Sequence, residues 1–301
     1  MPSTLSTKAV NLVVRTDATP SIGTGHAMRC ATLIDEWISA SFGSATVVGA
    51  FEIPFVRKRL KATGAEIERV LPQAAGFVLI VDSYDPAIRA ESLRTSGAAL
   101  TVLVDDLGGV VEGYDVVWNP NAYRSENLYP AFKGRIISER VPIRSGLPAW
   151  RGGSSRVGVS IGGGDPAPWL VEGLGHWAKM LPKPPLAPKA RWIPEGWDQA
   201  SPDDPWQAFA DCDVLVTAAG STIWEAACVG IPVCALQTMP NQALIARWLR
   251  SNDARVMEAV SPIEPEAFSG SLMNGVKAAS RLPKVKNGAR EAAGTLYSWA
   301  S

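Results

Sequence analysis

Apolar and polar positions alternate with two different periods along the first half of the chain. Short apolar runs predict strands, and segments whose apolar residues recur at helical spacing follow them. Strands are predicted at 11–15, 45–51, 77–82, 100–105 and 116–119, and helices at 26–39, 54–63 and 87–96. Because strands that alternate with helices form parallel sheets covered on both faces, this half predicts an α/β domain.

The same alternation begins again after residues 145–155, which are rich in glycine, proline, serine and arginine. Strands are predicted at 156–161, 213–217 and 231–236, and helices at 167–180, 222–229, 241–251 and within 266–300. Residues 181–205 are rich in proline and predict irregular structure. The 301 residues therefore predict two α/β domains, 1–146 and 147–301, joined by a linker or hinge.

Polar residues follow the carboxyl ends of four predicted strands in the first domain. They are Asp17, Asp82, the pair Asp105 and Asp106, and Asn119. Open α/β sheets bind ligands at this edge. Strand ends can also be polar because they meet water, but four such endings favour a binding site.

A glycine loop leads from the first predicted strand into the first predicted helix. Gly23 and Gly25 lack side chains that would keep a ligand from the backbone, and the positive end of a helix favours an anion. The same dipole disfavours imidazolium at His26, and a neutral imidazole can accept a proton. A tight turn with a structural histidine would have the same sequence, so this loop alone leaves both interpretations open.

Two loops in the second domain follow the same logic. The Gly-Gly-Gly-Asp segment 162–165 lies between a predicted strand and a helix, where successive backbone N–H groups can face a phosphate. In Gly-Ser-Thr at 220–222, the hydroxyls can cap the next helix or bind phosphate oxygens. Glu225 either completes a capping box with Thr222 or accepts hydrogen bonds from the two hydroxyls of a ribose.

Composition and motif searches exclude several classes of protein. With 29 acidic and 29 basic residues and no basic run, nucleic acid is not an expected partner. The four cysteines form no Cys-x-x-Cys pair, so neither a zinc site nor a disulfide framework is expected. The absence of Gly-x-Gly-x-x-Gly and of a Walker lysine argues against NAD binding and ATP hydrolysis. We find no signal peptide or membrane span in the sequence and expect a cytoplasmic protein.

Six motifs occur in an informative order. They are Gly-Thr-Gly-His-Ala-Met-Arg-Cys (23–30), Val-Asp-Ser-Tyr (81–84), Val-Asp-Asp (104–106), Gly-Gly-Gly-Asp-Pro (162–166), Ala-Gly-Ser-Thr-Ile-Trp-Glu (219–225) and Asn-Gln (241–242). From Arg15 to about Arg250, the set resembles the PseG-type nucleotide-sugar hydrolases of pseudaminic acid biosynthesis. These hydrolases are related to MurG-type glycosyltransferases and to the spore-coat SpsG proteins.

The resemblance implies a GT-B fold, which is two Rossmann-like domains with a cleft between them, and a reaction that needs neither a metal nor a cofactor. The implied reaction is inverting hydrolysis of the anomeric C–O bond of a nucleoside-diphosphate sugar, with UDP favoured as the nucleotide. It assigns catalytic roles to His26 as general base, Tyr84 and Asn241. We assign substrate binding to Arg15, Asp17, Gly23, Gly25, Asp82 and Gln242. The residues assigned to the nucleotide are Gly162, Gly163, Gly164, Asp165, Gly220, Ser221, Thr222 and Glu225.

Two departures from the family pattern keep alternatives open. Residue 83 is Ser where these hydrolases have His, and residues 181–205 are shorter than the unit that contacts the base in relatives. Trp192 or Trp197 could stack on the base instead. A glycosyltransferase that moves the sugar to a hydroxyl acceptor is the alternative function, and a non-catalytic nucleotide-sugar-binding protein is a third. The sequence indicates no oligomeric state.

Overall fold

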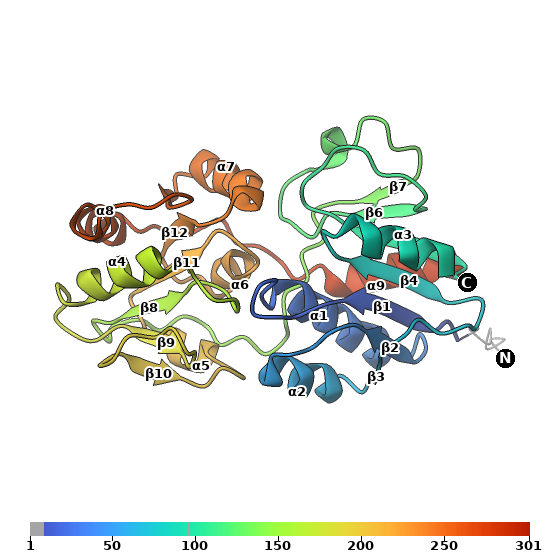
Figure 1. The fold of residues 1–301 in the computed structure, drawn as a ribbon, viewed down its shortest axis with the longest axis horizontal. Coiled ribbons are helices and arrows are strands. Elements are labelled where there is room, and N and C mark those ends of the chain that lie inside the picture. Colours follow the sequence, from blue (N-terminus) through green and yellow to red (C-terminus); the bar gives the residue numbers. More distant parts are fainter. Residues whose placement is uncertain (1–8, 96) are drawn as a thin grey trace, which may run out of the picture. The chain divides into compact units, whose positions relative to one another are not determined.

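The computed structural model describes residues 9–95 and 97–301 and divides the chain into two compact units (Figure 1). Unit 1 consists of Met1–Ile143 together with Asn287–Ser301, and unit 2 consists of Arg144–Lys286. Each unit is built on one parallel sheet, as the sequence predicts for an α/β protein.

The sheet of unit 1 has seven parallel strands in the order β3-β2-β1-β4-β5-β6-β7. Its strands are β1 (Leu12–Thr16), β2 (Ala45–Val48), β3 (Glu66–Glu68), β4 (Val78–Asp82), β5 (Leu100–Val104), β6 (Val116–Trp118) and β7 (Arg135–Ile137). Its helices are α1 (Gly25–Ser39), α2 (Pro54–Ala62), α3 (Pro86–Thr95), the 3-10 turn η1 (Glu126–Leu128) and α9 (Ala289–Ala300). The five predicted strands and three predicted helices are confirmed, except that Ser96 lies outside the described residues. The short strands β3 and β7 were missed because only three residues of each enter the sheet.

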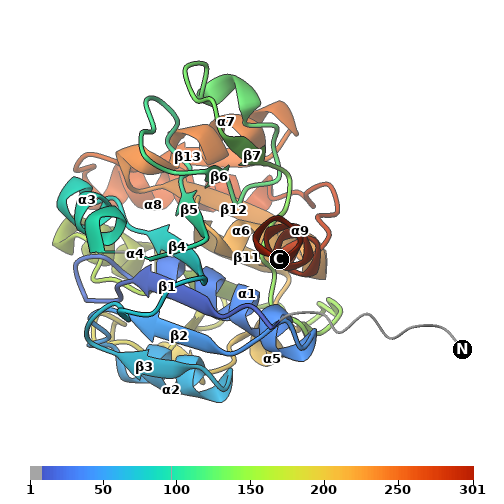
Figure 2. The same cartoon turned by 90° about the vertical axis from the view of Figure 1, so that its right-hand side faces the viewer.

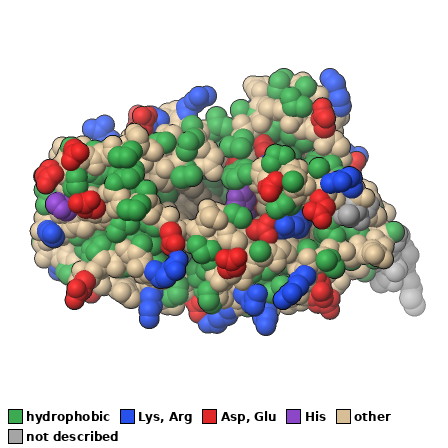
Figure 3. Space-filling model, in the orientation of Figure 1, with side chains coloured by type: hydrophobic (Ala, Val, Ile, Leu, Met, Phe, Trp, Pro, Cys, Tyr) green, Lys and Arg blue, Asp and Glu red, His purple; other side chains and the backbone are tan. Residues whose placement is uncertain are grey.

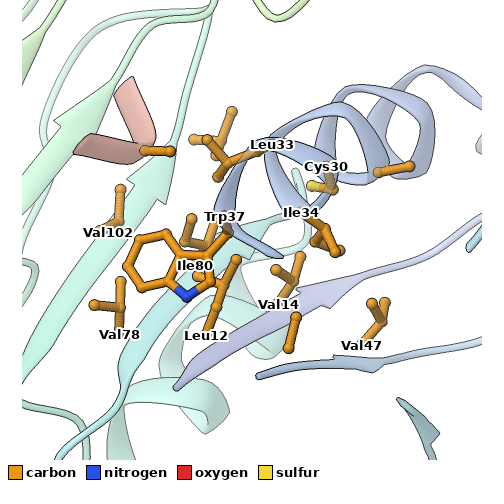
Figure 4. Close-up of a cluster of buried hydrophobic side chains, with 14 of the residues drawn as sticks. Leu12, Val14, Cys30, Leu33, Ile34, Trp37, Val47, Val78, Ile80 and Val102 are labelled. Carbon is orange, nitrogen blue, oxygen red and sulfur yellow. The ribbon is translucent and has the colours of Figure 1, made fainter. Parts of the chain in front are cut away.

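Successive residues of the central strands enter two different cores. Leu12 and Val14 face α1 with Trp37 (Figure 4). Val13 lies in a second cluster, against which Leu93 of α3 packs. This explains why the central strands are apolar without interruption, since both faces of the sheet are covered. Trp37 is fully buried, and its indole N–H donates to the carbonyl of Val10 at 3.1 Å.

The last helix, α9, belongs to unit 1. The predicted boundary of 147–301 had placed it in the second domain. It packs along α1 (Figure 2), where Leu296 joins the core and Tyr297 stacks on Phe42 with ring centroids 4.3 Å apart. Asn287 fixes the return of the chain, because its side-chain oxygen accepts a hydrogen bond from the amide of Ile143. The amphipathic pattern predicts a helix with one buried stripe, but it does not say which sheet covers that stripe.

Unit 2 contains a six-stranded parallel sheet in the order β10-β9-β8-β11-β12-β13. Its strands are β8 (Val157–Ser160), β9 (Leu186–Pro188), β10 (Asp198–Ala200), β11 (Val214–Ala218), β12 (Val233–Gln237) and β13 (Arg255–Glu258). Its helices are α4 (Pro168–Ala178), α5 (Trp206–Phe209), α6 (Thr222–Val229), the 3-10 turn η2 (Pro240–Gln242), α7 (Ala243–Ser251) and α8 (Pro265–Lys277). In both units the first strand lies beside the fourth, with the second and third on one side of it. This is the Rossmann-like order.

The prediction of irregular structure at 181–205 is wrong, because β9 and β10 lie there at one edge of the sheet. An edge strand can contain proline, and Pro188 ends β9. Trp197 is 8% exposed within the core of unit 2, and Trp192 packs against that core, edge-on to Trp197. Burial of Trp197 argues against the expectation that it stacks on a nucleotide base.

The glycine-rich segment 145–155, predicted as a linker, is attached to unit 2 along much of its length. The amide of Arg151 donates to the carbonyl of Ala210, and the Trp150 indole donates to that of Cys212. The amide of Gly153 donates to the Asp213 carboxylate at 2.6 Å. Glycine is needed here for the turns, since Gly152 and Gly153 both have positive φ.

Helix length and apolar character bear on membrane insertion, and one face of the molecule shows how charge is distributed. Among residues 9–95 and 97–301, no helix has the length and apolar character needed to cross a bilayer. On the face drawn in Figure 3, acidic and basic side chains are interspersed among hydrophobic ones. This matches the equal numbers of acidic and basic residues in the sequence.

Replacing Leu296 by Ala should destabilise unit 1 by about 2–5 kcal/mol, because it leaves a cavity between α9 and α1. Hydrogen exchange read by mass spectrometry should show faster exchange in peptides from α1 and unchanged exchange in peptides from α4. The matched control is Leu107→Ala, since Leu107 is 45% exposed. Equal loss of protection in α4 would contradict the assignment of α9 to unit 1.

Candidate functional site

The candidate site of unit 1 lies where the chain direction across the sheet reverses. From β1 the chain continues to β2 on one side, and from β4 it continues to β5 on the other. The loops after β1 and β4 therefore diverge at the carboxyl edge, the place where open α/β sheets bind ligands. His26 follows β1 in the first turn of α1, and Asp82 is the last residue of β4.

The imidazole of His26 and the carboxylate of Asp82 form a buried pair at this edge. His26 Nδ1 lies 2.5 Å from Asp82 Oδ1, and the Asp82 side chain is fully buried. A carboxylate accepts hydrogen bonds, so Nδ1 carries the proton in this pair. When the ring donates from Nδ1 in this way, Nε2 is the ring atom left to accept a proton.

Arg29 holds the opposite side of the same carboxylate. Its Nε and Nη2 donate to the two oxygens of Asp82, both at 2.6 Å, and its Nη1 donates to Asp106 at 3.0 Å. Burial by itself would raise the pKa of Asp82, but the charge of Arg29 and the hydrogen bonds from Arg29 and His26 lower that pKa well below its usual range. Asp82 is therefore a carboxylate that is fully engaged with the protein. It orients His26, and its assignment to substrate binding remains a prediction.

Arg29 lies within the motif at 23–30, although no role was expected for it. The spacing of the two residues indicates their contact. Residues three apart on a helix share a face, so Arg29 lies beside His26. Burial lowers the pKa of Arg29, yet Asp82 and Asp106 raise it well above the usual value, so the guanidinium stays charged.

Tyr84 lies beside His26, as expected for a residue of the same site. Its hydroxyl donates to Asp106 at 2.7 Å, and its ring meets the imidazole edge-on with centroids 4.7 Å apart. Burial raises the pKa of Tyr84, and the negative charge of Asp106 raises it further. The phenol therefore acts as a hydrogen-bond donor and a packing surface for His26, and not as a base.

Asp105 and Asn119, which follow two further predicted strands, form hydrogen bonds with groups of the protein. The hydroxyl of Tyr129 donates to the backbone carbonyl of Asp105 at 2.7 Å, and the Asn119 amide donates to that hydroxyl at 3.2 Å. Arg89 donates to the Asp105 carboxylate at 3.0 Å. These groups brace the loops that follow β5 and β6.

Arg15 and Asp17 pair with each other on the β2 side of β1. Arg15 Nη1 lies 2.8 Å from Asp17 Oδ1, which also accepts the amide of Ala50 at 2.7 Å. These contacts join the ends of β1 and β2 and give both residues a structural role. Their assignment to substrate binding remains a prediction.

The glycine loop before α1 has the backbone that its sequence predicts. Gly23 has φ near +84°, and its amide closes a turn on the carbonyl of Thr19. Gly25 is the first residue of α1, and Thr24 at the N-cap forms no side-chain capping hydrogen bond. The start of α1 thus keeps backbone donors that an anionic ligand can use.

In unit 2 the chain direction across the sheet reverses in the same way, at a switch point between β8 and β11. The glycine loop, with Gly163 and Gly164, leaves β8 at Gly162, which has φ near +97° and open space where a Cβ would lie. Asp165 pairs with Arg191 at 2.8 Å, and both side chains are exposed. Arg191 therefore brings a positive charge to this loop, a contact that the sequence pattern did not show.

The loop after β11 leads into α6, where Ser221 is the N-cap and Thr222 the first helical residue. Ser221 forms no side-chain capping hydrogen bond, and Gly220 has open space where a Cβ would lie. Glu225 does not complete a capping box, since it lies one residue beyond the third helical position. Its Oε2 instead accepts the Trp206 indole N–H at 2.7 Å.

Asn241 and Gln242 lie in η2, after β12 of unit 2, whereas His26 and Tyr84 lie in unit 1. The side-chain oxygen of Gln242 accepts the amides of Thr238 and Met239 at 2.8 and 3.3 Å, which shapes this turn. Asn241 is exposed. The catalytic role of Asn241 and the substrate contact of Gln242 stay predictions.

No protein-family model and no curated protein matches the chain. Solved structures do match. The UDP-GlcNAc 2-epimerase from Neisseria meningitidis bound to UDP-GlcNAc has a TM-score of 0.63 at 10% identity, over 96% of this chain and 100% of that one. The spinosyn forosaminyltransferase SpnP has a TM-score of 0.59 at 11% identity, over 97% and 95%. The glycosyltransferase SsfS6 of Streptomyces sp. SF2575, complexed with thymidine diphosphate, has a TM-score of 0.54 at 12% identity, over 94% and 99%.

These similarities confirm the predicted fold class. The chain has the GT-B fold, with two Rossmann-like parallel sheets, that nucleotide-sugar glycosyltransferases and UDP-GlcNAc 2-epimerases share. At these identities the likeness extends to the fold alone.

Replacing Asp82 by Asn should destabilise the protein by about 3–5 kcal/mol at pH 7, because it breaks a buried ion pair and leaves Arg29 short of a carboxylate. The depressed pKa of Asp82 means that its contribution is complete above the ordinary aspartate pKa of about 3.9 and is lost as the pH falls through the lower value of the folded state. Denaturant unfolding between pH 3 and pH 7 should therefore show a difference in the free energy of unfolding between the wild type and Asp82→Asn. This difference should narrow only at the acid end of the range.

The matched control is Asp35→Asn, which removes a partly exposed partner of Arg59 and should cost no more than about 1 kcal/mol. The buried pairing would be contradicted if Asp82→Asn lowered the free energy of unfolding by less than Asp35→Asn does.

Proposed function

We propose that the chain is an enzyme that hydrolyses a nucleoside-diphosphate sugar to free sugar and nucleoside diphosphate, with UDP as the favoured nucleotide. The observation that carries the proposal is the buried His26–Asp82 pair at the switch point of unit 1. A neutral imidazole that a carboxylate orients in this way is suited to general-base catalysis. The GT-B fold and the nucleotide sugars bound by proteins that share it add support.

In this reaction the Nε2 atom of His26 takes a proton from water as the water oxygen attacks the anomeric carbon. The bond between that carbon and the diphosphate oxygen breaks, the nucleoside diphosphate leaves with the electron pair, and the anomeric configuration inverts. Asp82 stabilises the imidazolium that forms, and Arg29 keeps Asp82 ionised. Tyr84 packs against the ring and limits its rotation.

Unit 2 supplies the nucleotide site in this proposal. Backbone N–H groups of the 162–164 loop and of the 220–222 loop bind the diphosphate, which stabilises the negative charge of the leaving group. Glu225 accepts hydrogen bonds from the ribose hydroxyls. Its place after the switch point and its lack of a capping role support this assignment over the capping box.

The PseG-type substrate is the finer proposal, and Ser83 bears on it. Ser83 occupies the position between Asp82 and Tyr84 where the hydrolase family has His. Its hydroxyl accepts the amide of Asp85 at 3.1 Å, and its carbonyl accepts Arg89 Nε at 2.6 Å. This segment therefore brings no second imidazole to the site, so the sugar can differ from that of the resembling family. Sugar transfer to a hydroxyl acceptor is the alternative, since the same base can deprotonate it.

Incubation with a panel of UDP-, TDP- and CMP-sugars, analysed by chromatography, tests the proposed reaction. Release of free sugar in buffer supports hydrolysis, whereas turnover only with cell extract supports an acceptor and a transferase. Conversion to an epimeric nucleotide sugar would instead support an epimerase. No consumption of any sugar in the panel would count against the proposed enzyme class.

His26→Ala should lower turnover at least about 100-fold, because it removes the proton acceptor, and should leave nucleotide affinity nearly unchanged. The measurements are initial rates and calorimetric titration with UDP. The matched control is His176→Ala, which changes the chain's other histidine, a 40% exposed side chain on α4. A fully active His26→Ala protein would remove His26 as the base.

Glu225→Ala should weaken UDP binding by about 1.5–3 kcal/mol, because charged hydrogen bonds to the ribose are lost. Calorimetry measures the change, and Glu172→Ala on the exposed surface of α4 is the control. Unchanged UDP affinity in Glu225→Ala would show that this carboxylate does not bind the nucleotide.

A further inference from the structure

We propose that Trp206 is a positioning residue that fixes the Glu225 carboxylate and thereby gives unit 2 a preference for ribose over 2′-deoxyribose nucleotides. Arg144 and Asp204 complete this arrangement. The inference rests on the proposed function, because it assumes that Glu225 meets the sugar of a nucleotide. It adds the residues that decide which nucleotide sugar the site accepts.

The two oxygens of Glu225 have different partners. Oε2 accepts the indole N–H of Trp206 at 2.7 Å, and Oε1 lies 3.6 Å from Nε of Arg144. The first contact is a hydrogen bond and the second is an ion pair. Together they set both the rotation of the carboxylate plane and its charge.

Trp206 is a rigid partner. Its side chain is 2% exposed at the start of α5 and meets Phe209 edge-on, with ring centroids 5.8 Å apart. The ring cannot follow a moving carboxylate without disturbing this packing. The position of the indole N–H therefore fixes Glu225, whose long side chain otherwise has several rotamers.

Arg144 is held in turn by Asp204. Its Nη2 donates to Asp204 Oδ1 at 2.7 Å, and its side chain is 15% exposed. Arg144 is also the residue at which the chain enters unit 2. The positive guanidinium thus lies beside the Glu225 carboxylate, whose ionised form accepts hydrogen bonds and donates none.

A carboxylate fixed in this way suits a vicinal diol. Each carboxylate oxygen can accept more than one hydrogen bond, so an oxygen bound to the protein can also accept from a ribose hydroxyl. When the carboxylate is oriented before binding, the ligand does not lose affinity in ordering it. A site built around the 2′-hydroxyl discriminates against a nucleotide that lacks it, because the carboxylate is then left without that donor.

Calorimetric titration with UDP and with dUDP tests the inference in the full-length chain. In Trp206→Phe, which keeps an aromatic ring and removes the N–H, UDP affinity should fall about 10-fold. The affinity for dUDP should change less than about 3-fold, so the UDP preference shrinks. A loss of packing alone would weaken both nucleotides equally.

Trp177→Phe is the matched control. Trp177 is a fully buried tryptophan of α4 in the same unit, and its indole N–H has no hydrogen-bond partner among the described residues. Trp177→Phe makes the same change in ring size as Trp206→Phe but removes no hydrogen bond. Its UDP preference over dUDP should match that of the wild type.

Asp204→Asn provides a second variant that does not depend on the packing of Trp206, since the Asp204 side chain is 46% exposed. It removes the carboxylate that holds Arg144 in place. The preference for UDP over dUDP should therefore fall, as in Trp206→Phe, but by a smaller factor. If Trp206→Phe does not fold by circular dichroism, this variant decides, and a wild-type preference in it overturns the inference.

The outcomes separate the inference from the proposed function. If Glu225→Ala loses UDP affinity while Trp206→Phe and Asp204→Asn keep the wild-type preference, the positioning role is wrong and the nucleotide site stands. If the wild type binds UDP and dUDP equally, the ribose preference is wrong. If Glu225→Ala binds UDP as the wild type does, Glu225 is not the ribose contact, and both the assignment and the inference fail.

Discussion

The candidate site of unit 1 depends on one buried carboxylate. Asp82 ends a strand that is covered on both faces, so its charge has no access to water and must be balanced by neighbours. Arg29 provides that balance, and His26, one helical turn away on α1, adds a hydrogen bond to the same carboxylate. The same contacts hold α1 against the end of β4. The charge that would be costly if it were isolated thus stabilises the site and orients the imidazole.

The two units use one topology for two kinds of chemistry. Both sheets place their first strand beside their fourth, and in both units the residues of interest follow those two strands. In unit 1 the positions carry titratable side chains that are linked to each other. In unit 2 they carry glycines, hydroxyls and a single glutamate. The fold supplies the edge, and the side chains placed on it give the two units different chemical groups there.

Much of the polar content at the edge of the unit 1 sheet supports the loops that leave it. Asp105, Asn119 and the Arg15–Asp17 pair each satisfy groups within unit 1. This is expected where parallel strands end in buried surroundings, because loops that leave them carry backbone groups that need partners. A polar residue at a strand end is therefore weak evidence of ligand contact until its partners are known. His26 differs because its pairing with Asp82 leaves Nε2 as the acceptor.

Local sequence determined the central strands, most helices and the glycine loops, because apolar periodicity and backbone freedom are properties of neighbouring residues. It placed His26 after β1 and Glu225 in α6 for the same reason. It could not show that α9 returns to unit 1, that β9 and β10 form an edge of the second sheet, or that Arg29 shares Asp82 with His26. Those features depend on surfaces and charges that are distant in the chain, and only the packed tertiary structure decides which of them meet.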